Sequence, residues 1–265
     1  AFDDHMKLRL GDFAVWSGVP GHGKSSAVNH ICCKMADLHG LKTIFASFEQ
    51  NPQDDHRENL EIWWQAEHGG GSQFTPDNVP LFRSEDDRQR CHAWIDKNFF
   101  FLHPSDDEFP TVDYILERVA TVILRHDVKI VVIDPWNEIE HEVGSRQNTH
   151  EYTSLAIRKF KKFAKKWGVH LIIVAHPTKI KAEMRDKPIT LYDIADTASW
   201  ANRCDLGVIV HAESDGVMAL LVVKSRYHRK IGKPGVKRFH FTPLDNHLQI
   251  LPEEEGVVFE KFKTK

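Results

Sequence analysis

The feature that most constrains this chain of 265 residues is a glycine-rich segment near its start, Gly18-Val-Pro-Gly-His-Gly-Lys-Ser25. It matches the pattern G-x-x-x-x-G-K-[S/T] in full, and it follows Phe13–Trp16, an apolar run typical of a strand. After it, apolar residues recur every three or four positions as far as Leu38, which predicts a helix that ends at Gly40. A strand, a phosphate loop and a helix in this order predict an α/β fold.

Short apolar runs alternate with stretches of helical periodicity along the next part of the chain. We expect helices over about residues 52–67, 112–123 and 152–167. The strands expected between them are Thr43–Phe48, Phe99–Leu102, Lys129–Ile133 and Val169–Ala175. Because Ile130 to Ile133 are all β-branched, the strand Lys129–Ile133 is typical of a parallel strand whose two faces are both covered by helices.

The pattern changes after Asp205 to short strands joined by turn residues, which predicts hairpins. These strands are Gly207–His211, Val217–Val223, Lys237–Phe241 and Leu248–Leu251. The sequence therefore predicts a single α/β domain over residues 1–265, a mostly parallel central sheet flanked by helices with an antiparallel hairpin end. Residues 69–98 are polar and show little strand character, so we expect an insertion there.

Composition excludes several classes of protein. With 35 Lys and Arg against 38 Asp and Glu, the formal net charge is −3, which argues against a constitutively basic nucleic-acid binder. It leaves room for positive charge gathered on one inner surface. The four cysteines form no CxxC pair, which argues against a disulfide scaffold or a zinc module. No apolar run is long enough for a membrane span, and there is no signal peptide.

The glycine-rich loop predicts a site for a nucleotide triphosphate and Mg²⁺. Its glycines let backbone N–H groups face a phosphate at the start of a helix, where the helix dipole favours anions. We expect Lys24 to reach the β- and γ-phosphates and the Ser25 hydroxyl to ligate Mg²⁺. The residues expected to bind the nucleotide and its metal are Gly18, Gly21, His22, Gly23, Lys24, Ser25, Ser26 and Asp134.

Two carboxylates and a histidine follow other predicted strands, at the edge where open α/β sheets bind ligands. Asp134 ends an apolar strand and is interpreted as a Walker B aspartate; the alternative is a turn cap before Pro135. Glu49 is interpreted as the catalytic base, the alternative being an exposed loop glutamate. His176 is interpreted as a sensor of the γ-phosphate, and a structural histidine is the alternative.

Taken together, the motifs resemble the RecA-like motor domain of DnaB-like hexameric replicative helicases, and most of all the Toprim-type primase–helicases of phages and mitochondria. The resemblance covers nearly the whole chain. It rests on GVPGHGKSS (18–26), SFEQ (47–50), VVIDPW (131–136), AHPTK (175–179) and VVKSRYHRKIG (222–232). It implies that Glu49 is catalytic, that His176 senses the γ-phosphate, and that Lys224 and Arg226 act in trans on ATP bound by a neighbouring subunit.

The resemblance also implies an activity and partners. It implies a DNA helicase that hydrolyses ATP with Mg²⁺ and translocates on single-stranded DNA, 5′ to 3′, as a homo-oligomeric and hexameric ring. A primase module on the same or another chain would be a further partner, and no membrane is involved. The location implied is the cytoplasm of a bacterial or phage-infected cell, or an organellar matrix. Because the chain begins at Ala1 without Met, we expect a fragment of a longer polypeptide.

Family members bind DNA through loops that face the central channel, and these match residues 142–150 and 179–203 here. The cations expected to contact DNA are Lys179, Lys181, Arg185 and Arg203. Asp196-Thr197 replaces the family's small Gly-Ser step, and Ser199 stands where relatives often have lysine. These departures remove positive charge. They keep open the alternative of a RecA-like regulatory or recombination ATPase that does not unwind DNA.

Two further features have a simpler interpretation than DNA binding. The basic run on the predicted helix 152–167 is interpreted as the solvated face of an amphipathic helix. Its members are Arg158, Lys159, Lys161, Lys162, Lys165 and Lys166. The Trp63–Trp64 pair is interpreted as a packing or subunit contact rather than a platform on which bases stack.

Overall fold

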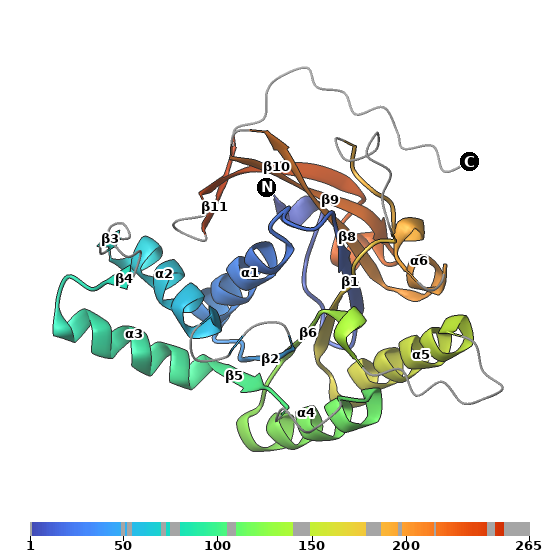
Figure 1. The fold of residues 1–265 in the computed structure, drawn as a ribbon, viewed down its shortest axis with the longest axis horizontal. Coiled ribbons are helices and arrows are strands. Elements are labelled where there is room, and N and C mark those ends of the chain that lie inside the picture. Colours follow the sequence, from blue (N-terminus) through green and yellow to red (C-terminus); the bar gives the residue numbers. More distant parts are fainter. Residues whose placement is uncertain are drawn as a thin grey trace.

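A single large sheet organises the computed structural model, which describes residues 2–48, 51, 55–69, 73–74, 80–104, 110–139, 149–178, 187–195, 198–214, 216–242 and 247–251. The strand order is β11-β10-β9-β8-β1-β7-β6-β2-β5 (Figure 1). The strands are β1 (Phe13–Ser17), β2 (Thr43–Ser47), β5 (Phe99–Leu102), β6 (Ile130–Asp134), β7 (His170–Val174), β8 (Leu206–Ser214), β9 (Val217–Ser225), β10 (Gly235–Thr242) and β11 (His247–Ile250). A separate two-stranded sheet pairs β3 (Gln73–Phe74) with β4 (Pro80–Leu81).

Strand direction divides the sheet into two parts. From β8 through β1, β7, β6 and β2 to β5, neighbouring strands pair in parallel. From β8 to β11 they pair antiparallel. The predicted fold class, a mostly parallel sheet with an antiparallel hairpin end, is confirmed. We call the edge where the parallel strands end the carboxyl edge, and the edge where they begin the amino edge.

Helices cover both faces of the sheet, so its central strands are apolar on both sides. One face packs against α1 (Lys24–His39), α2 (Arg57–His68) and α3 (Glu85–Asn98). The other packs against α4 (Val112–His126), α5 (Thr149–Trp167) and α6 (Ser199–Arg203) (Figure 1). The alternation along β1 is clear. Phe13 and Val15 join the core beneath α4 and α5, whereas Ala14 and Trp16 join the core beneath α1.

Residues at the helix ends account for where several helices start and stop. The α1 helix ends at Gly40, whose φ of 63° is a left-handed conformation that glycine adopts without a steric penalty. The Thr111 hydroxyl accepts a hydrogen bond from the Tyr114 N–H at the start of α4. The described residues also form short helices. These are 3-10 helices at Phe2–Asp4, Trp136–Glu138 and Leu191–Asp193, and the α-helix α7 (His228–Ile231).

The segment predicted as a polar insertion, residues 69–98, contains the regular helix α3. Ser84 caps it by accepting from the Asp87 N–H, and its first turn is acidic, which suits the positive end of the helix dipole. Apolar periodicity does not predict this helix, because most of the surface of α3 is polar. Only Cys91, Ile95 and Asn98 are buried along it.

The paired tryptophans of α2 lie inside the protein, which confirms that they have a packing role. Trp63 is 1% exposed and Trp64 is 5% exposed. Trp63 stacks on Trp94 of α3, with ring centroids 5.7 Å apart and an interplanar angle of 11°. A buried, stacked indole offers no surface on which a base could stack.

Two expectations from composition concern the whole chain. All four cysteines are free and buried, as the absence of a disulfide pattern predicted. Burial raises the pKa of Cys32 to about 12, so this thiol stays protonated at neutral pH. Within the described residues, no helix has both the length and the apolar character that crossing a membrane requires.

Candidate functional site

The glycine-rich loop connects β1 to α1 at the carboxyl edge of the sheet, as predicted. Lys24 is the first residue of α1 and is only 6% exposed. Its ammonium donates to the loop's own carbonyl oxygens, that of Gly18 at 3.0 Å and that of Val19 at 3.3 Å. The loop is thus folded around the charged end of Lys24, which places a cation in the hollow where a phosphate would bind.

Two glycines of the loop occupy positions that no other residue fits well. Gly23, which caps the start of α1, has a φ of 79°, and a Cβ there would lie 2.5 Å from Met218 Cε. A Cβ on Gly18 would lie 2.3 Å from the carbonyl oxygen of Val210 on β8. The β8–β9 hairpin therefore packs directly against the loop, and the antiparallel end of the sheet supports the shape of the phosphate site.

Ser25 and Asp134 meet at the carboxyl edge. Ser25 follows β1 and Asp134 ends β6, and β7 lies between these two strands in the sheet. The Ser25 hydroxyl donates to the Asp134 carboxylate at 2.6 Å, joining the start of α1 to the end of β6. A hydroxyl oxygen and a carboxylate oxygen side by side are the donors that Mg²⁺ prefers. The pair therefore fits the predicted metal site, and the alternative of Asp134 as a turn cap leaves this contact unexplained.

His22 extends the loop toward the hairpin. Its Nδ1 accepts from the Ala212 N–H at 3.2 Å, and its ring lies 5.3 Å from that of His211, centroid to centroid. Burial first, and then the nearby His211 and Lys24, lower the pKa of His22. The imidazole is therefore a neutral acceptor that fastens the loop to β8.

The other predicted residues of the carboxyl edge follow β2 and β7. His176 comes directly after β7, and its backbone N–H donates to Asn137 Oδ1 at 2.9 Å. Its backbone is thereby fixed beside the segment that follows Asp134. Glu49 lies outside the described residues. The residue before it, Phe48, donates its N–H to the carbonyl oxygen of Asp134 at 3.3 Å.

Lys224 and Arg226 lie at the amino edge, away from the phosphate loop. Ser225 pairs with Leu206 at the end of β9, and the Arg226 N–H donates to the Asp205 carbonyl oxygen at 2.8 Å. The Asp205 N–H in turn donates to the carbonyl oxygen of Phe13, the first residue of β1. The phosphate loop follows the last residue of β1, so about 13 Å of strand separates it from this edge.

Both cations point at the end of α6. The Lys224 ammonium donates to the carbonyl oxygen of Ala201, and burial lowers the pKa of Lys224. The guanidinium of Arg226 donates through Nη2 to the carbonyl oxygens of Asn202, Arg203 and Cys204, at 3.0, 3.4 and 3.3 Å. Both side chains are therefore hydrogen-bonded to the end of α6, although that of Arg226 is still 38% exposed.

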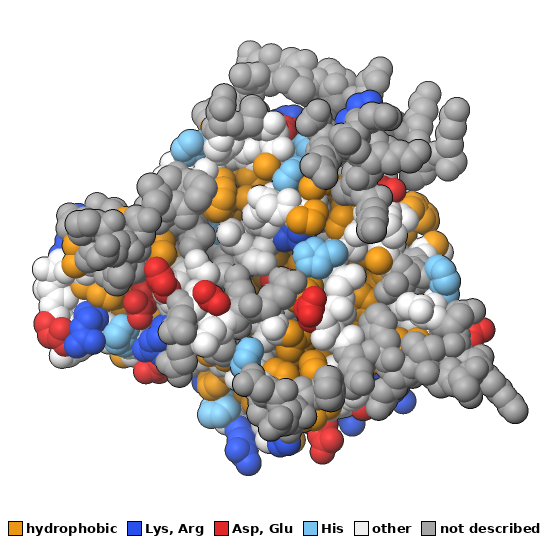
Figure 2. All heavy atoms as spheres, viewed as in Figure 1, with side chains coloured by type: hydrophobic (Ala, Val, Ile, Leu, Met, Phe, Trp, Pro, Cys, Tyr) orange, Lys and Arg blue, Asp and Glu red, His pale blue; other side chains and the backbone are white. Residues whose placement is uncertain are grey.

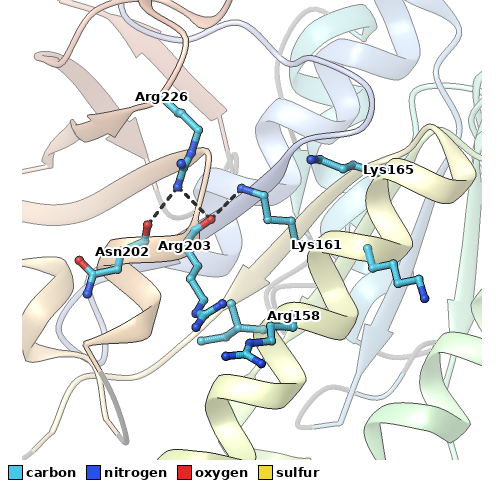
Figure 3. A pocket seen from close by; sticks show the side chains of 8 residues that line it. Arg158, Lys161, Lys165, Asn202, Arg203 and Arg226 are labelled. Carbon is cyan, nitrogen blue, oxygen red and sulfur yellow. Dashed lines mark hydrogen bonds between the residues drawn. The ribbon is translucent and has the colours of Figure 1, made fainter.

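A groove of about 510 Å³ opens beside Arg226 (Figure 3). Six of its eight lining residues are basic, and they come from α5, from the end of α6 and from Arg226 itself. The lining is Ile157, Arg158, Lys161, Lys162, Lys165, Asn202, Arg203 and Arg226. The basic run of α5 thus does more than face solvent, because Lys161 turns into the groove and donates to the Arg203 carbonyl oxygen at 2.9 Å.

The residues predicted to contact DNA are only partly described. Lys179, Lys181 and Arg185 lie outside the described residues, as do Asp196 and Thr197. Arg203 is described, at the last position of α6, where it lines the groove. On the face shown in Figure 2, the Lys and Arg side chains of the described residues are scattered and form no single patch.

Sequence reasoning missed one residue that organises the amino edge, Asp205. Its carboxylate is 1% exposed and pairs with Lys161 at 2.6 Å and with Arg226 at 3.0 Å. No motif includes this position. The only signal in the sequence was a charged residue directly before a buried strand.

Comparisons with known proteins agree with this geometry. Residues 4–182 match a protein family described as AAA domain. The chain is 30% identical over 218 residues to the Twinkle homolog protein, chloroplastic/mitochondrial, of Arabidopsis thaliana. The aligned region covers 80% of this chain and 30% of that relative. The chain therefore spans less than a third of the length of this relative.

Two solved structures share the fold. The ATPase domain of G40P superposes with a TM-score of 0.74 at 17% identity, covering 92% of this chain and 86% of that one. A DnaB-like replicative helicase, solved to show its interactions with primase, also gives a TM-score of 0.74, at 16% identity, covering 92% of this chain and 60% of that one. At these identities the two matches establish the shared fold.

Proposed function

Because this chain belongs to the AAA domain family, we propose that it hydrolyses ATP and is the motor domain of a ring-shaped replicative DNA helicase. The observation that carries the proposal is the contact of Ser25 with Asp134 beside the buried ammonium of Lys24, at the carboxyl edge of a parallel sheet. Its fold is that of a DnaB-like helicase and of a phosphate-loop ATPase domain, and a Twinkle homologue is related in sequence.

The residues of the carboxyl edge have distinct roles in this chemistry. Bound Mg²⁺ would offset the charge that develops on the transferred phosphoryl group. Ser25 and Asp134 would hold the metal, and Lys24 would exchange its loop carbonyl partners for phosphate oxygens. Glu49 would orient the attacking water, and His176, fixed by Asn137, would contact the γ-phosphate. Lys24, Ser25 and Asp134 lie together at this edge, and the backbone of His176 is held there by Asn137.

Lys224 and Arg226 would act on a nucleotide held by another copy of this chain. Their position at the amino edge supports this, because about 13 Å of β1 lies between that edge and the chain's own phosphate loop. An arginine supplied in trans stabilises the charge of the transition state in other phosphate-loop enzymes. We therefore propose a homo-oligomeric ring, hexameric by family analogy, in which the amino edge of one subunit faces the carboxyl edge of the next.

The proposed substrate of the motor is single-stranded DNA in the centre of this ring. Lys179, Lys181, Arg185 and Arg203 remain the candidate contacts, and a primase module is the proposed further partner. A location in the cytoplasm or an organellar matrix is proposed on the same family grounds. We further propose that residues 1–265 form a single motor domain and that residues 69–98 are an insertion in it.

The test is ATP-dependent strand displacement on a forked DNA substrate, with ATP hydrolysis measured in parallel with and without single-stranded DNA. We expect hydrolysis that DNA stimulates and displacement that requires ATP and Mg²⁺. Lys24→Ala serves as the control, since it should remove both activities. Hydrolysis that DNA does not stimulate, with no displacement, would favour the alternative of a regulatory ATPase that does not unwind DNA.

A further inference from the structure

We propose that Asp205 is the positioning residue for Arg226: its buried carboxylate and the last carbonyl groups of α6 hold one side of the guanidinium, so that the other side faces the groove. The inference rests on the trans role of Arg226 proposed above. It adds a residue that no motif indicates.

Burial makes the Asp205 carboxylate an effective anchor. A buried carboxylate is costly unless it is paired and hydrogen-bonded, and Asp205, at 1% exposure, is both. Its Oδ1 is shared by the ammonium of Lys161 at 2.6 Å and by Nε of Arg226 at 3.0 Å, while Oδ2 accepts from the Phe13 N–H at 3.3 Å. The carboxylate is therefore also hydrogen-bonded to the backbone of the first residue of β1, which holds it in place independently of the two cations.

The guanidinium of Arg226 is held along one side only. Nε is bound to Asp205, and Nη2 is bound to the three carbonyl oxygens at the end of α6. Among the described residues Nη1 has no hydrogen-bond partner, and the side chain is 38% exposed where it lines the groove (Figure 3). Because the guanidinium is planar and rigid, fixing the Nε–Nη2 side also fixes the direction in which Nη1 points. An anion that enters the groove would meet this group already oriented.

Lys161 provides a matched comparison at the same carboxylate. It joins α5 to Asp205 as Arg226 joins the end of β9, and it shares two acceptors with Arg226, Asp205 Oδ1 and the Arg203 carbonyl oxygen. If Asp205 served only to fasten α5, loss of Lys161 and loss of the carboxylate charge would have similar effects. If Asp205 serves Arg226, they would differ.

The experiment compares Asp205→Asn, Arg226→Ala, the double variant and Lys161→Met in the full chain. Steady-state ATP hydrolysis is measured at concentrations where the wild-type chain is assembled, and nucleotide binding is measured on dilute chains. We expect Asp205→Asn to lower kcat by about 10²-fold, the cost of misplacing a reacting group by about 1 Å. Nucleotide affinity should not change, because Asp205 lies at the other edge of the sheet from the phosphate loop. Lys161→Met should lower kcat less than Asp205→Asn does, because the carboxylate and its contact with Arg226 remain.

The double variant gives the decisive result. If Asp205 acts through Arg226, adding Asp205→Asn to Arg226→Ala should cause no further loss of kcat. Losses that multiply would overturn the inference, as would a Lys161→Met defect as large as that of Asp205→Asn, or a rise in kcat in Asp205→Asn. A normal rate in Arg226→Ala would overturn the trans role itself, and this inference with it. A normal rate in Asp205→Asn beside an impaired Arg226→Ala would overturn this inference alone.

Arg226→Lys keeps the proposal testable if Asp205→Asn does not fold. Lysine retains the positive charge but has no Nε–Nη2 side for Asp205 and the α6 carbonyl oxygens to hold. We expect its kcat to be as low as that of Arg226→Ala. A wild-type rate in Arg226→Lys would show that charge alone is sufficient and would overturn the inference.

Discussion

The carboxyl and amino edges of the sheet both hold a cation against carbonyl oxygens, yet they differ in what accompanies it. At the carboxyl edge, Lys24 lies in a glycine loop, and a hydroxyl and a carboxylate, those of Ser25 and Asp134, meet beside it. At the amino edge, Arg226 is held by Asp205 and lines a groove that is mostly basic. The first edge has what a nucleotide and its metal need. The second has cations gathered around one buried carboxylate.

The two edges therefore differ in what each can do within a single chain. An edge that contains a phosphate loop and the proposed metal ligands should bind nucleotide in a single chain. An edge that offers only oriented cations should matter only when another chain supplies the phosphate. The two edges are complementary halves of one proposed site, and variants at each should therefore fail in different ways.

Loss of Lys24 should have the largest effect and tests the carboxyl edge. Lys24→Ala removes the charge that would contact the β- and γ-phosphates, so hydrolysis should be abolished and nucleotide binding greatly weakened, even in dilute chains. Binding is measured by fluorescence titration with a labelled nucleotide, and hydrolysis by phosphate release. Turnover at the wild-type rate would refute the phosphate-loop assignment.

Loss of Arg226 tests the amino edge. Arg226→Ala should leave the nucleotide affinity of dilute chains nearly unchanged, whereas hydrolysis by the assembled form should fall by about 10³-fold. Mixing it with Lys24→Ala should restore part of the activity, because one chain supplies the arginine and the other the phosphate loop. The absence of any such recovery would contradict a trans role, and a lower melting temperature of the monomer would indicate a structural one.

Loss of the Glu49 carboxylate should affect ATP hydrolysis but not nucleotide binding, although both depend on the carboxyl edge. Glu49→Gln keeps the size and polarity of the side chain, so nucleotide binding should persist while hydrolysis falls by about 10²-fold, the range for loss of a general base. The same two assays used for Lys24→Ala give the comparison. Equal loss of binding and hydrolysis would mean that Glu49 holds the metal or the fold instead of acting as the base.

The carboxyl edge could be predicted from the sequence because its residues lie in contiguous motifs at strand ends. The loop, the contact partners Ser25 and Asp134, and the position of His176 after β7 all follow from reading strands and the residues that succeed them. The amino edge could not be predicted in the same way. Asp205, Lys161 and Arg226 are far apart in the sequence, and only the pairing of β8 with β1 and β9 brings them together.

The same contrast explains two features elsewhere in the chain that the sequence did not reveal. The basic run of α5 is largely exposed, as expected, but periodicity reports only which side of a helix is apolar, and it does not report that α6 and Arg226 complete a groove beside these lysines and arginines. The helix α3 was missed because only a narrow strip of it is buried. In both cases the missing information was the tertiary partner.

A comparison of the two edges at different pH values is valid only while the fold is intact, and buried His30 sets a limit on the acid side. His30 lies on α1, and its Nδ1 accepts from Trp63 Nε1 at 3.0 Å and from the Leu248 N–H at 3.2 Å. Burial, and then the nearby His247 and Lys34, lower the pKa of His30 to about 3. Protonation would place a hydrogen on the nitrogen that accepts both bonds, so the folded protein favours the neutral ring.

The sign of the effect on stability follows from this shift. The ordinary pKa of His30 lies above its value in the folded protein, so between the two values the unfolded chain binds more protons. The stabilisation is complete above about pH 6.5 and is lost as the pH falls toward 3. From pH 7 to pH 5 this single group should lower the free energy of unfolding by about 2 kcal/mol.

Urea unfolding at pH 7 and pH 5 measures this effect, with His30→Asn as the comparison. Asparagine keeps an acceptor near the position of Nδ1 but cannot take up a proton, so the variant should be less stable at pH 7 and lose about 2 kcal/mol less than the wild type on acidification. Buried His56, whose pKa burial lowers to about 4, remains in both proteins and contributes equally to each. Equal losses in the two proteins would show that His30 does not set the acid limit, and differences between the edges at pH 5 would then need another explanation than partial unfolding at α1.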